Sequence, residues 1–214
     1  MARVSLLDHG LAGRTGHHFD LTLNLARRLR EAGHRVSVCG HRDPAPEVGA
    51  AFARGGFEYH GRFTDPAGVP KALREGAASA WSGRVQRIAR ELAATPPADL
   101  WLFPTLTVDH LAALAALPEP PPVAGLVHEA PDSLGRGAPE LWTGACRTLR
   151  SRALRVALGA IDPDLADLLR PASAGLDVHA FPVPWEGRPR GAYPARPRRV
   201  GFFGHQRRER GLAR

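Results

Sequence analysis

The sequence predicts an α/β fold built on a doubly wound, mainly parallel sheet. Short apolar runs alternate with longer amphipathic segments through most of the 214 residues. The apolar runs are nearly continuous, as expected for strands that are buried on both faces. Glycines stand at junctions between the two kinds of segment, where the chain turns from strand to helix or back. Together these observations favour a sheet with helices on both sides.

The start of the chain shows the pattern most clearly. Residues 3–7 predict a strand, and residues 10–16 predict a loop that contains three glycines. Apolar residues then recur at three- and four-residue spacing over 17–32, which predicts an amphipathic helix that Gly33 ends. Residues 35–39, Arg-Val-Ser-Val-Cys, predict the second strand. The order strand, helix, strand is a βαβ unit.

The same alternation continues to residue 181. Further strands are predicted over 57–60, 99–103, 123–128, 155–161 and 176–181, and helices over 47–54, 69–94, 108–117, 139–152 and 163–169. Gly76 and Gly83 are candidate breaks in the longest of these helices. Asp162 followed by Pro163 is typical of a helix start.

The composition changes after residue 181. Residues 182–197 are rich in proline and glycine and lack periodicity, which predicts a linker. Residues 198–214 predict a strand ending at Gly204 and then a loop. Because this tail is too short to form a domain, we expect the front of a longer protein. The alternative is that the last strand joins the first sheet. The expected organisation is a domain over 1–181, a linker over 182–197 and the start of a second domain over 198–214.

The charge and cysteine content exclude several classes. Lysine and arginine number 29 against 21 acidic residues, a net charge of +8, which suits nucleic acid, an anionic membrane or phosphorylated small molecules as partners. No apolar run approaches the roughly 18 residues of a membrane helix, and the N-terminus lacks the features of a signal peptide. Cys39 and Cys146 form neither a zinc pair nor a disulfide framework. We therefore predict a cytoplasmic protein without a metal site.

Three stretches carry a family resemblance. They are the glycine loop with Gly16-His17-His18 and the helix end up to Val38, the segment Val178–Pro184, and residues 199–212. In this order they resemble the helix opening, the exit from the first domain and the start of the second domain of GT-B glycosyltransferases. The resemblance is closest to the retaining, glycogen-synthase-like group. It implies two facing Rossmann-like domains, of which this chain holds the acceptor side and the first strand of the nucleotide-sugar side.

The resemblance implies transfer of a sugar from a nucleoside diphosphate sugar to a hydroxyl group. The acceptor would be a lipid, a polysaccharide or a small molecule. The protein's work would be positioning and stabilisation of the leaving diphosphate. The nucleotide sugar is a substrate, and no cofactor or metal is implied. The positive charge also allows peripheral contact with the inner face of an anionic membrane. Because the donor domain is incomplete, activity is expected of the full-length protein.

Candidate site residues follow on the acceptor side. Gly13 and Gly16 precede a helix start, where backbone N–H groups bind anions, although a simple turn also needs glycine. His17, at the helix start, is a candidate hydrogen-bond partner of the acceptor. His128 follows the strand over 123–127, at the carboxyl end where parallel sheets bind ligands. It matches a family histidine that contacts the transferred sugar, which makes it the catalytic candidate. Glu129 is a candidate acid–base or acceptor contact, or else a turn residue.

The donor-side candidates are Gly204, Arg207 and Arg210. In the family, two cations near the first glycines of the second domain balance the leaving diphosphate. Here His205 stands in the place of the first cation, and Arg210 precedes Gly211. The alternative is an exposed basic tail.

Three other functions remain as alternatives. A dinucleotide-dependent oxidoreductase would need a G-x-G-x-x-G loop and an acidic residue after the second strand, where the chain has Cys39-Gly-His-Arg42. A non-catalytic nucleic-acid or anion-binding module suits the charge but lacks aromatic residues among the basic clusters. An inactive, truncated remnant of a glycosyltransferase is the third alternative.

Overall fold

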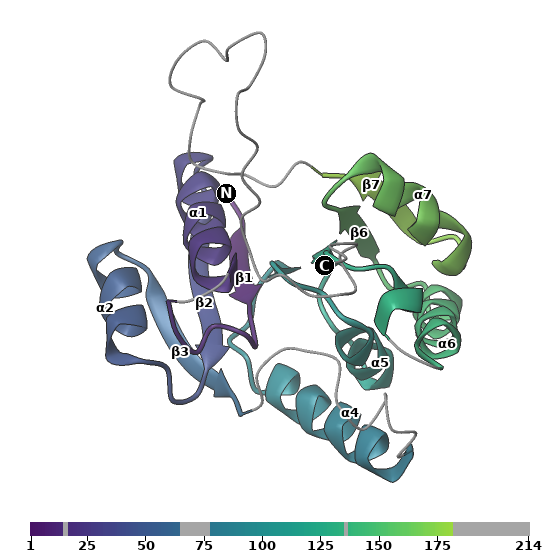
Figure 1. Cartoon of the computed structure of the whole chain (residues 1–214). Coiled ribbons are helices and arrows are strands. Elements are labelled where there is room, and N and C mark those ends of the chain that lie inside the picture. Colours follow the sequence, from purple (N-terminus) through teal and green to yellow (C-terminus); the bar gives the residue numbers. More distant parts are fainter. Residues whose placement is uncertain (15–16, 65–77, 135–136, 182–214) are drawn as a thin grey trace, which may run out of the picture.

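A computed structural model describes residues 1–14, 17–64, 78–134 and 137–181. Within these residues one sheet of seven strands has the order β3-β2-β1-β4-β5-β6-β7, and every neighbouring pair is parallel (Figure 1). The strands are β1 (Arg3–Leu7), β2 (Arg35–His41), β3 (Glu58–Phe63), β4 (Leu100–Phe103), β5 (Val123–Val127), β6 (Val156–Ala160) and β7 (Asp177–Ala180). The predicted doubly wound, Rossmann-like parallel sheet is confirmed.

The helices follow the predicted alternation. They are α1 (His17–Glu31), α2 (Pro46–Arg54), α4 (Ala78–Ala93), α5 (Val108–Ala116), α6 (Ala138–Ser151), α7 (Pro163–Ala172) and the short 3-10 helix η1 (Pro131–Leu134). Helix α4 runs without interruption through Gly83, so that glycine is not a break. The first part of the predicted helix over 69–94, with Gly76, lies outside the described residues. So do the expected linker over 182–197 and the expected second-domain start over 198–214.

Local signals in the sequence account for several helix ends. Gly33 adopts a φ of 86°, a left-handed conformation that glycine takes at little cost, and it follows the end of α1. At the start of α7, the Asp162 carboxylate accepts a hydrogen bond from the backbone N–H of Leu165 at 2.8 Å. The prediction of a helix start at Asp162 is confirmed.

Each face of the sheet has its own cluster of buried side chains. Helices α1 and α2 cover one face through residues that include Phe19, Leu25, Val48 and Phe52. Helices α4 to α7 cover the other face through residues that include Ile88, Leu111, Trp142 and Leu165. Figure 1 shows α1 and α2 on one side of the sheet and α4, α5 and α6 on the other. Burial of such side chains, at about 25 cal/mol per Å² of apolar surface, holds the layers together.

The direction of winding reverses between β1 and β4. From β1 the chain proceeds to β2 and β3 on one side, and then crosses to β4 and continues to β7 on the other. The two connections leave β1 and β4 in opposite directions beyond the carboxyl ends of these strands. This switch point is where open α/β sheets bind their ligands.

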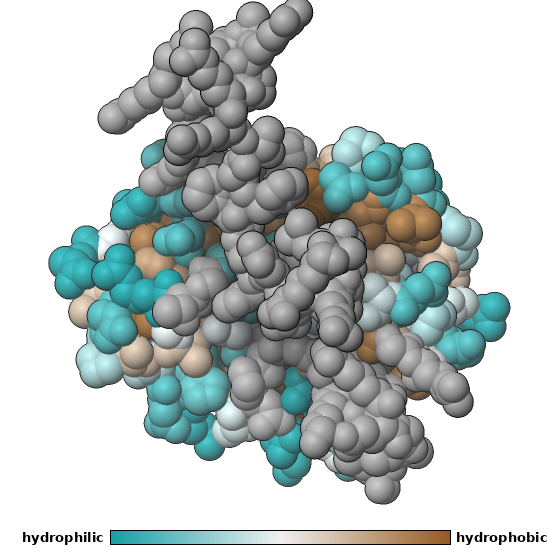
Figure 2. All heavy atoms as spheres, viewed as in Figure 1, coloured by the Kyte–Doolittle hydropathy of each residue, from teal (hydrophilic) through white to brown (hydrophobic). Residues whose placement is uncertain are grey.

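The surface is largely polar. Among the described residues only Met1, Leu168 and Phe181 are large apolar side chains that are well exposed. Figure 2 shows hydrophilic residues over much of the described surface in that view, with hydrophobic residues exposed on the side where α7 lies. None of the described helices combines the length and the hydropathy that crossing a bilayer requires.

Candidate active site

A buried carboxylate and a histidine form a dyad at the switch point. Asp8 directly follows β1, and His18 is the second residue of α1. Asp8 Oδ1 lies 2.8 Å from Nδ1 of His18, while Asp8 Oδ2 accepts a hydrogen bond from the Thr22 hydroxyl at 2.6 Å. The backbone N–H of Gly10 also donates to Asp8 Oδ1, at 2.9 Å. Three donors therefore hold a fully buried carboxylate in one orientation.

The dyad sets the protonation of His18. Burial by itself lowers the pKa of this imidazole, but the hydrogen bond from His18 to Asp8 and the negative charge of Asp8 outweigh it, so the pKa is raised. A ring that donates Nδ1–H to Asp8 keeps Nε2 as its second, reactive nitrogen. Within the described chain no hydrogen bond occupies Nε2. The arrangement is that of an oriented general base.

Gly10 makes room for this histidine. A Cβ atom at position 10 would lie 2.3 Å from Cε1 of the His18 ring, far inside van der Waals contact. Any side chain there would push the ring away from Asp8. Glycine at this position is therefore required for the close approach and not for a special φ angle.

Two further imidazoles lie against the dyad. The His17 ring stacks on the His18 ring with centroids 4.3 Å apart, and its centroid lies 4.9 Å from that of His128. Burial, followed by the charges of His18 and His128, lowers the pKa of His17 to about 4. His17 is thus neutral at physiological pH. The structure brings together His17 and His128, which the sequence singled out separately.

His128 follows β5, and its own hydrogen bond fixes its tautomer. Nε2 lies 2.9 Å from the carbonyl oxygen of Pro104, which can only accept, so Nε2 carries the proton. Burial lowers the pKa of His128 and favours the neutral form. Its Nδ1 is then an acceptor. In this orientation His128 can take a hydrogen bond from a hydroxyl group but has no spare N–H to give to one.

A second pair of histidines lies buried beneath this cluster. The backbone N–H of Thr107 donates to Nδ1 of His110 at 3.1 Å, so the His110 proton sits on Nε2, which lies 2.9 Å from Nδ1 of His9. His9 then carries its proton on Nε2, which faces Oε2 of Glu91 at 3.9 Å. Burial is the main cause that lowers the pKa of both imidazoles. The backbone N–H of Thr107 thereby fixes the tautomers of two neutral rings, which support the loop after β1.

The other predicted site residues are less closely involved. Gly13 lies in the described part of the loop before α1, and Gly16 lies outside the described residues. Glu129 is exposed beside His128 and makes no hydrogen bond within the described chain. Gly204, Arg207 and Arg210 lie outside the described residues, so their roles stay predictions.

The sequence favoured His17 over its neighbour His18 as the functional histidine, and it did not indicate Asp8, Gly10, Thr22 or the pair His9 and His110 as residues of the site. A usable signal existed for Asp8, because it is a polar residue directly after a buried strand, the same position that singled out His128. No comparable signal existed for Thr22, because its hydroxyl becomes functional only where α1 packs over the end of β1. Cys39, interpreted as a buried structural residue, is buried, and burial raises the pKa of its thiol to about 12.

The residues of the site offer hydrogen-bonding and proton-transfer chemistry. Within the described ranges, no group of three or more histidine, cysteine, aspartate or glutamate side chains has an arrangement that could hold a metal ion. Asp8 accepts hydrogen bonds from three donors, and Nδ1 of His18 and Nε2 of His128 are engaged with protein groups. Nε2 of His18 and Nδ1 of His128 make no hydrogen bond to a described residue, and both can accept one from a hydroxyl group.

Comparison with known proteins found structural similarity only. No protein-family model matches the sequence, and no curated protein matches it. The solved structures that match include the Streptomyces sp. SF2575 glycosyltransferase SsfS6, with 16% identity, a TM-score of 0.43 and coverage of 88% of this chain and 56% of that one. MurG of Acinetobacter baumannii matches with 15% identity, a TM-score of 0.40 and coverage of 86% and 46%.

A third structure is an alpha-glucosyltransferase in complex with UDP and a 13-mer DNA containing a HMU base. It matches with 9% identity, a TM-score of 0.45 and coverage of 86% of this chain and 43% of that one. The chain spans about half the length of each of these three glycosyltransferases. At these values the likeness carries no functional argument, and a function has to be argued from the side chains of the site.

Proposed function

We propose that this chain is the acceptor-binding half of a glycosyltransferase, which transfers a sugar from a nucleoside diphosphate sugar to a hydroxyl group. The observation that carries the proposal is the 2.8 Å contact between Asp8 and His18 at the switch point of the sheet. An imidazole oriented by a buried carboxylate is suited to removing a proton from a hydroxyl group. The resemblance of three sequence stretches to GT-B glycosyltransferases supports the same function.

In the proposed reaction His18 acts on the acceptor. Nε2 accepts the proton of the acceptor hydroxyl as its oxygen forms a bond to the anomeric carbon of the donor sugar. The bond from that carbon to the diphosphate breaks, and the nucleoside diphosphate leaves with the electron pair. Asp8 stabilises the imidazolium that forms, because its carboxylate lies against Nδ1. His128 positions the hydroxyl through Nδ1, and the loop that contains Gly13 lies beside the reacting groups.

The donor half of the proposal concerns residues outside the described part of the chain. Gly204, Arg207 and Arg210 would bind the diphosphate and balance its charge as it leaves. Gly16 would contribute a backbone N–H at the start of α1. No metal is assigned to the reaction. Peripheral contact with an anionic membrane would bring the enzyme to a lipid acceptor and belongs to the same proposal.

The stereochemical outcome separates two versions of the proposal. The sequence resemblance implies retention of the anomeric configuration. The dyad favours inversion, because a base that deprotonates the acceptor is what a direct displacement at the anomeric carbon requires. The anomeric configuration of the product, read by NMR from the coupling constant of the anomeric proton, decides between the two versions.

The proposal is tested with the full-length protein that the gene encodes. Transfer is assayed with a panel of nucleoside diphosphate sugars and hydroxyl acceptors, for the wild type and for His18→Gln. We expect transfer by the wild type and a loss of about 10²-fold or more in the variant. A wild type that is folded yet transfers no sugar, or a variant that keeps the full rate, would contradict the proposal. The first of these outcomes would favour a non-catalytic anion-binding module.

A further inference from the structure

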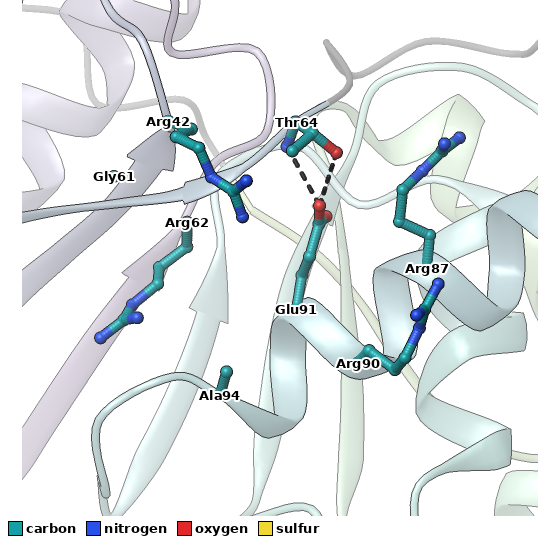
Figure 3. A pocket seen from close by; sticks show the side chains of 8 residues that line it. All are labelled: Arg42, Gly61, Arg62, Thr64, Arg87, Arg90, Glu91 and Ala94. Atoms are coloured by element: carbon teal, nitrogen blue, oxygen red, sulfur yellow. Dashed lines mark hydrogen bonds between the residues drawn. The ribbon is translucent and has the colours of Figure 1, made fainter.

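A pocket of about 480 Å³ lies between β3 and α4, outside the dyad. Arg42 lines it from just beyond β2, Arg62 lines it from β3, and Arg87 and Arg90 line it from α4 (Figure 3). Among the described residues that line it, Glu91 of α4 is the one that is acidic. The pocket opens where β2 and β3 end, the same edge of the sheet that carries the dyad beyond β1. Its volume is that of a small-molecule site.

The acidic residue of the pocket, Glu91, already has hydrogen-bond partners. Oε1 of Glu91 accepts hydrogen bonds from the hydroxyl of Thr64 at 2.6 Å and from its backbone N–H at 3.2 Å. Figure 3 shows the carboxylate turned up to Thr64, with Arg42 and Arg90 on opposite sides of it in that view. The other carboxylate oxygen faces Nε2 of His9. Glu91 therefore holds the end of β3 against α4, and within the described residues it forms no ion pair with Arg42, Arg62 or Arg90.

Three of the four arginines that line the pocket, Arg42, Arg62 and Arg90, have no ion pair with a described residue. In the part of the chain that the structure describes, no carboxylate lies within ion-pair distance of Arg42, Arg62 or Arg90. Nε of Arg62 is buried and has no hydrogen-bond partner among the described residues. A buried donor without a partner is rare in proteins and is normally taken by water or a ligand. Among the described residues, the pocket thus combines three arginines that have no ion pair with a buried hydrogen-bond donor that has no partner.

We propose that this pocket binds the phosphate group of a small phosphorylated ligand. Guanidinium groups match the tetrahedral array of phosphate oxygens and bind them through paired, charge-assisted hydrogen bonds. The ligand is small because the pocket is bounded by one strand and one helix. A polymer would need a basic groove that runs across the surface, together with stacking aromatic residues, and none of the described residues that line this pocket is aromatic.

If the proposed function holds, the phosphorylated ligand is the sugar acceptor. The pocket adjoins the dyad through Glu91, because one oxygen of this carboxylate faces His9, the residue after Asp8, while the other binds Thr64 at the pocket rim. A phosphate bound by the arginines would anchor the acceptor on the side of β3 and leave its hydroxyl group free to reach the switch point. The phosphate belongs either to a soluble molecule or to a lipid headgroup.

Binding of inorganic phosphate tests the pocket without any assay of activity. Calorimetric titrations at physiological ionic strength compare the wild type, the double variant R42Q/R62Q and the control R147Q. Arg147 is exposed on α6, so its variant removes one positive charge at a distance from the pocket. We expect saturable one-to-one binding that weakens by about tenfold or more in the double variant and is unchanged in the control. Circular dichroism verifies the fold, and Arg90→Gln replaces the double variant if that protein does not fold.

Two further arms separate the sources of phosphate and the two proposals. The proteins are co-sedimented with phosphatidylcholine vesicles that contain phosphatidic acid. Vesicle binding that is reduced in R42Q/R62Q and unchanged in R147Q identifies a lipid headgroup as the source of the phosphate. Phosphate binding without vesicle binding identifies a soluble ligand. His18→Gln should bind phosphate like the wild type. A protein that transfers no sugar but binds phosphate would therefore contradict the proposed function and still support the phosphate pocket. Equal binding by the wild type and R42Q/R62Q, or binding of random RNA in place of phosphate, overturns the pocket proposal.

Discussion

Asp8 and His18, ten residues apart in the sequence, are joined by a 2.8 Å contact between Oδ1 and Nδ1. The contact exists because Asp8 ends the first strand and His18 begins the helix that returns over the sheet. Thr22, one turn further along α1, holds the other carboxylate oxygen at 2.6 Å. The strand end and the first two turns of the helix therefore form one hydrogen-bonded unit, and substitutions within it should affect both stability and transfer.

Replacement of Asp8 by asparagine should impair His18 as a base while keeping the volume of the side chain at position 8. The amide cannot stabilise an imidazolium, so we expect the rate of sugar transfer by the full-length protein to fall by about 10²- to 10⁴-fold. The pKa of His18 should fall as well, because the hydrogen bond and the charge that raise it are lost. Asp20 of α1 is exposed, and Asp20→Asn is the matched control. A full rate in Asp8→Asn would exclude the dyad from catalysis.

The two adjacent histidines should titrate far apart. NMR titration of the chain should give a pKa of about 4 for His17 and a pKa above the usual 6.5 for His18. Because the neutral imidazole is the active base, transfer should rise as pH increases through the raised pKa of His18. The His17→Gln variant serves to assign the two resonances. Coincident titration of both rings near 6.5 would show that Asp8 does not set the protonation of His18.

Histidines that folding keeps neutral should make the protein less stable in acid. Folding lowers the pKa of His9, His17, His110 and His128, so the unfolded chain binds more protons than the folded chain once the pH drops below about 6.5. The free energy of unfolding therefore decreases as pH falls through this range and on towards 4. His18 has the opposite sign: its contribution is present below about 6.5 and is lost as pH rises through its raised pKa.

Urea unfolding at neutral and at mildly acidic pH measures this balance. We expect the urea midpoint to be lower at acidic pH, because folding lowers the pKa of four histidines and raises that of His18 alone among those with a shifted pKa in the described chain. In His110→Gln the dependence should be shallower, because one of the groups that take up protons on unfolding is gone. A midpoint that is constant from neutral to mildly acidic pH would contradict the lowered pKa values of these rings.

Substitution of Gly10 by alanine should separate the dyad. The added Cβ would meet the His18 ring at 2.3 Å, and the ring can move only by leaving Asp8. We expect a loss of about 1–3 kcal/mol in the free energy of unfolding and a loss of transfer activity. Gly49 of α2 is the control, because a Cβ there would meet nothing within 4 Å. Gly49→Ala should be neutral or stabilise the helix by about 0.5–1 kcal/mol.

The substitution His128→Gln should test the acceptor nitrogen of that histidine. The amide N–H₂ of the glutamine can replace Nε2–H as the donor to the Pro104 carbonyl, but the side chain offers nothing at the place of Nδ1. We expect a rise in KM for the acceptor and a rate reduced by about 10²-fold, with a fold as stable as the wild type. Glu129→Gln is the neighbouring comparison, and a larger effect there than at His128 would assign the acid–base role to Glu129.

The order and type of the helices and strands follow from local patterns in the sequence. Periodicity, the glycine after the first helix and the aspartate before Pro163 are local properties. They predicted the described strands and helices to within a few residues of the observed ends, apart from the start of the helix over 69–94, which lies outside the described residues. The same reasoning placed His128 at the carboxyl end of its strand, because the rule that ligands bind there needs only the order of elements.

Which side chains meet depends instead on how distant elements pack together. The sheet order brings β1 next to β4, so Nδ1 of His9 lies 2.9 Å from Nε2 of His110, although 101 positions of sequence separate the two residues. The role of Gly10 depends on the ring of His18, and the arginine pocket depends on α4 crossing beside β3. Local patterns carry no information on such contacts, because they form when separate elements pack. Burial and charge then set the pKa values that turn ordinary histidines into a candidate site.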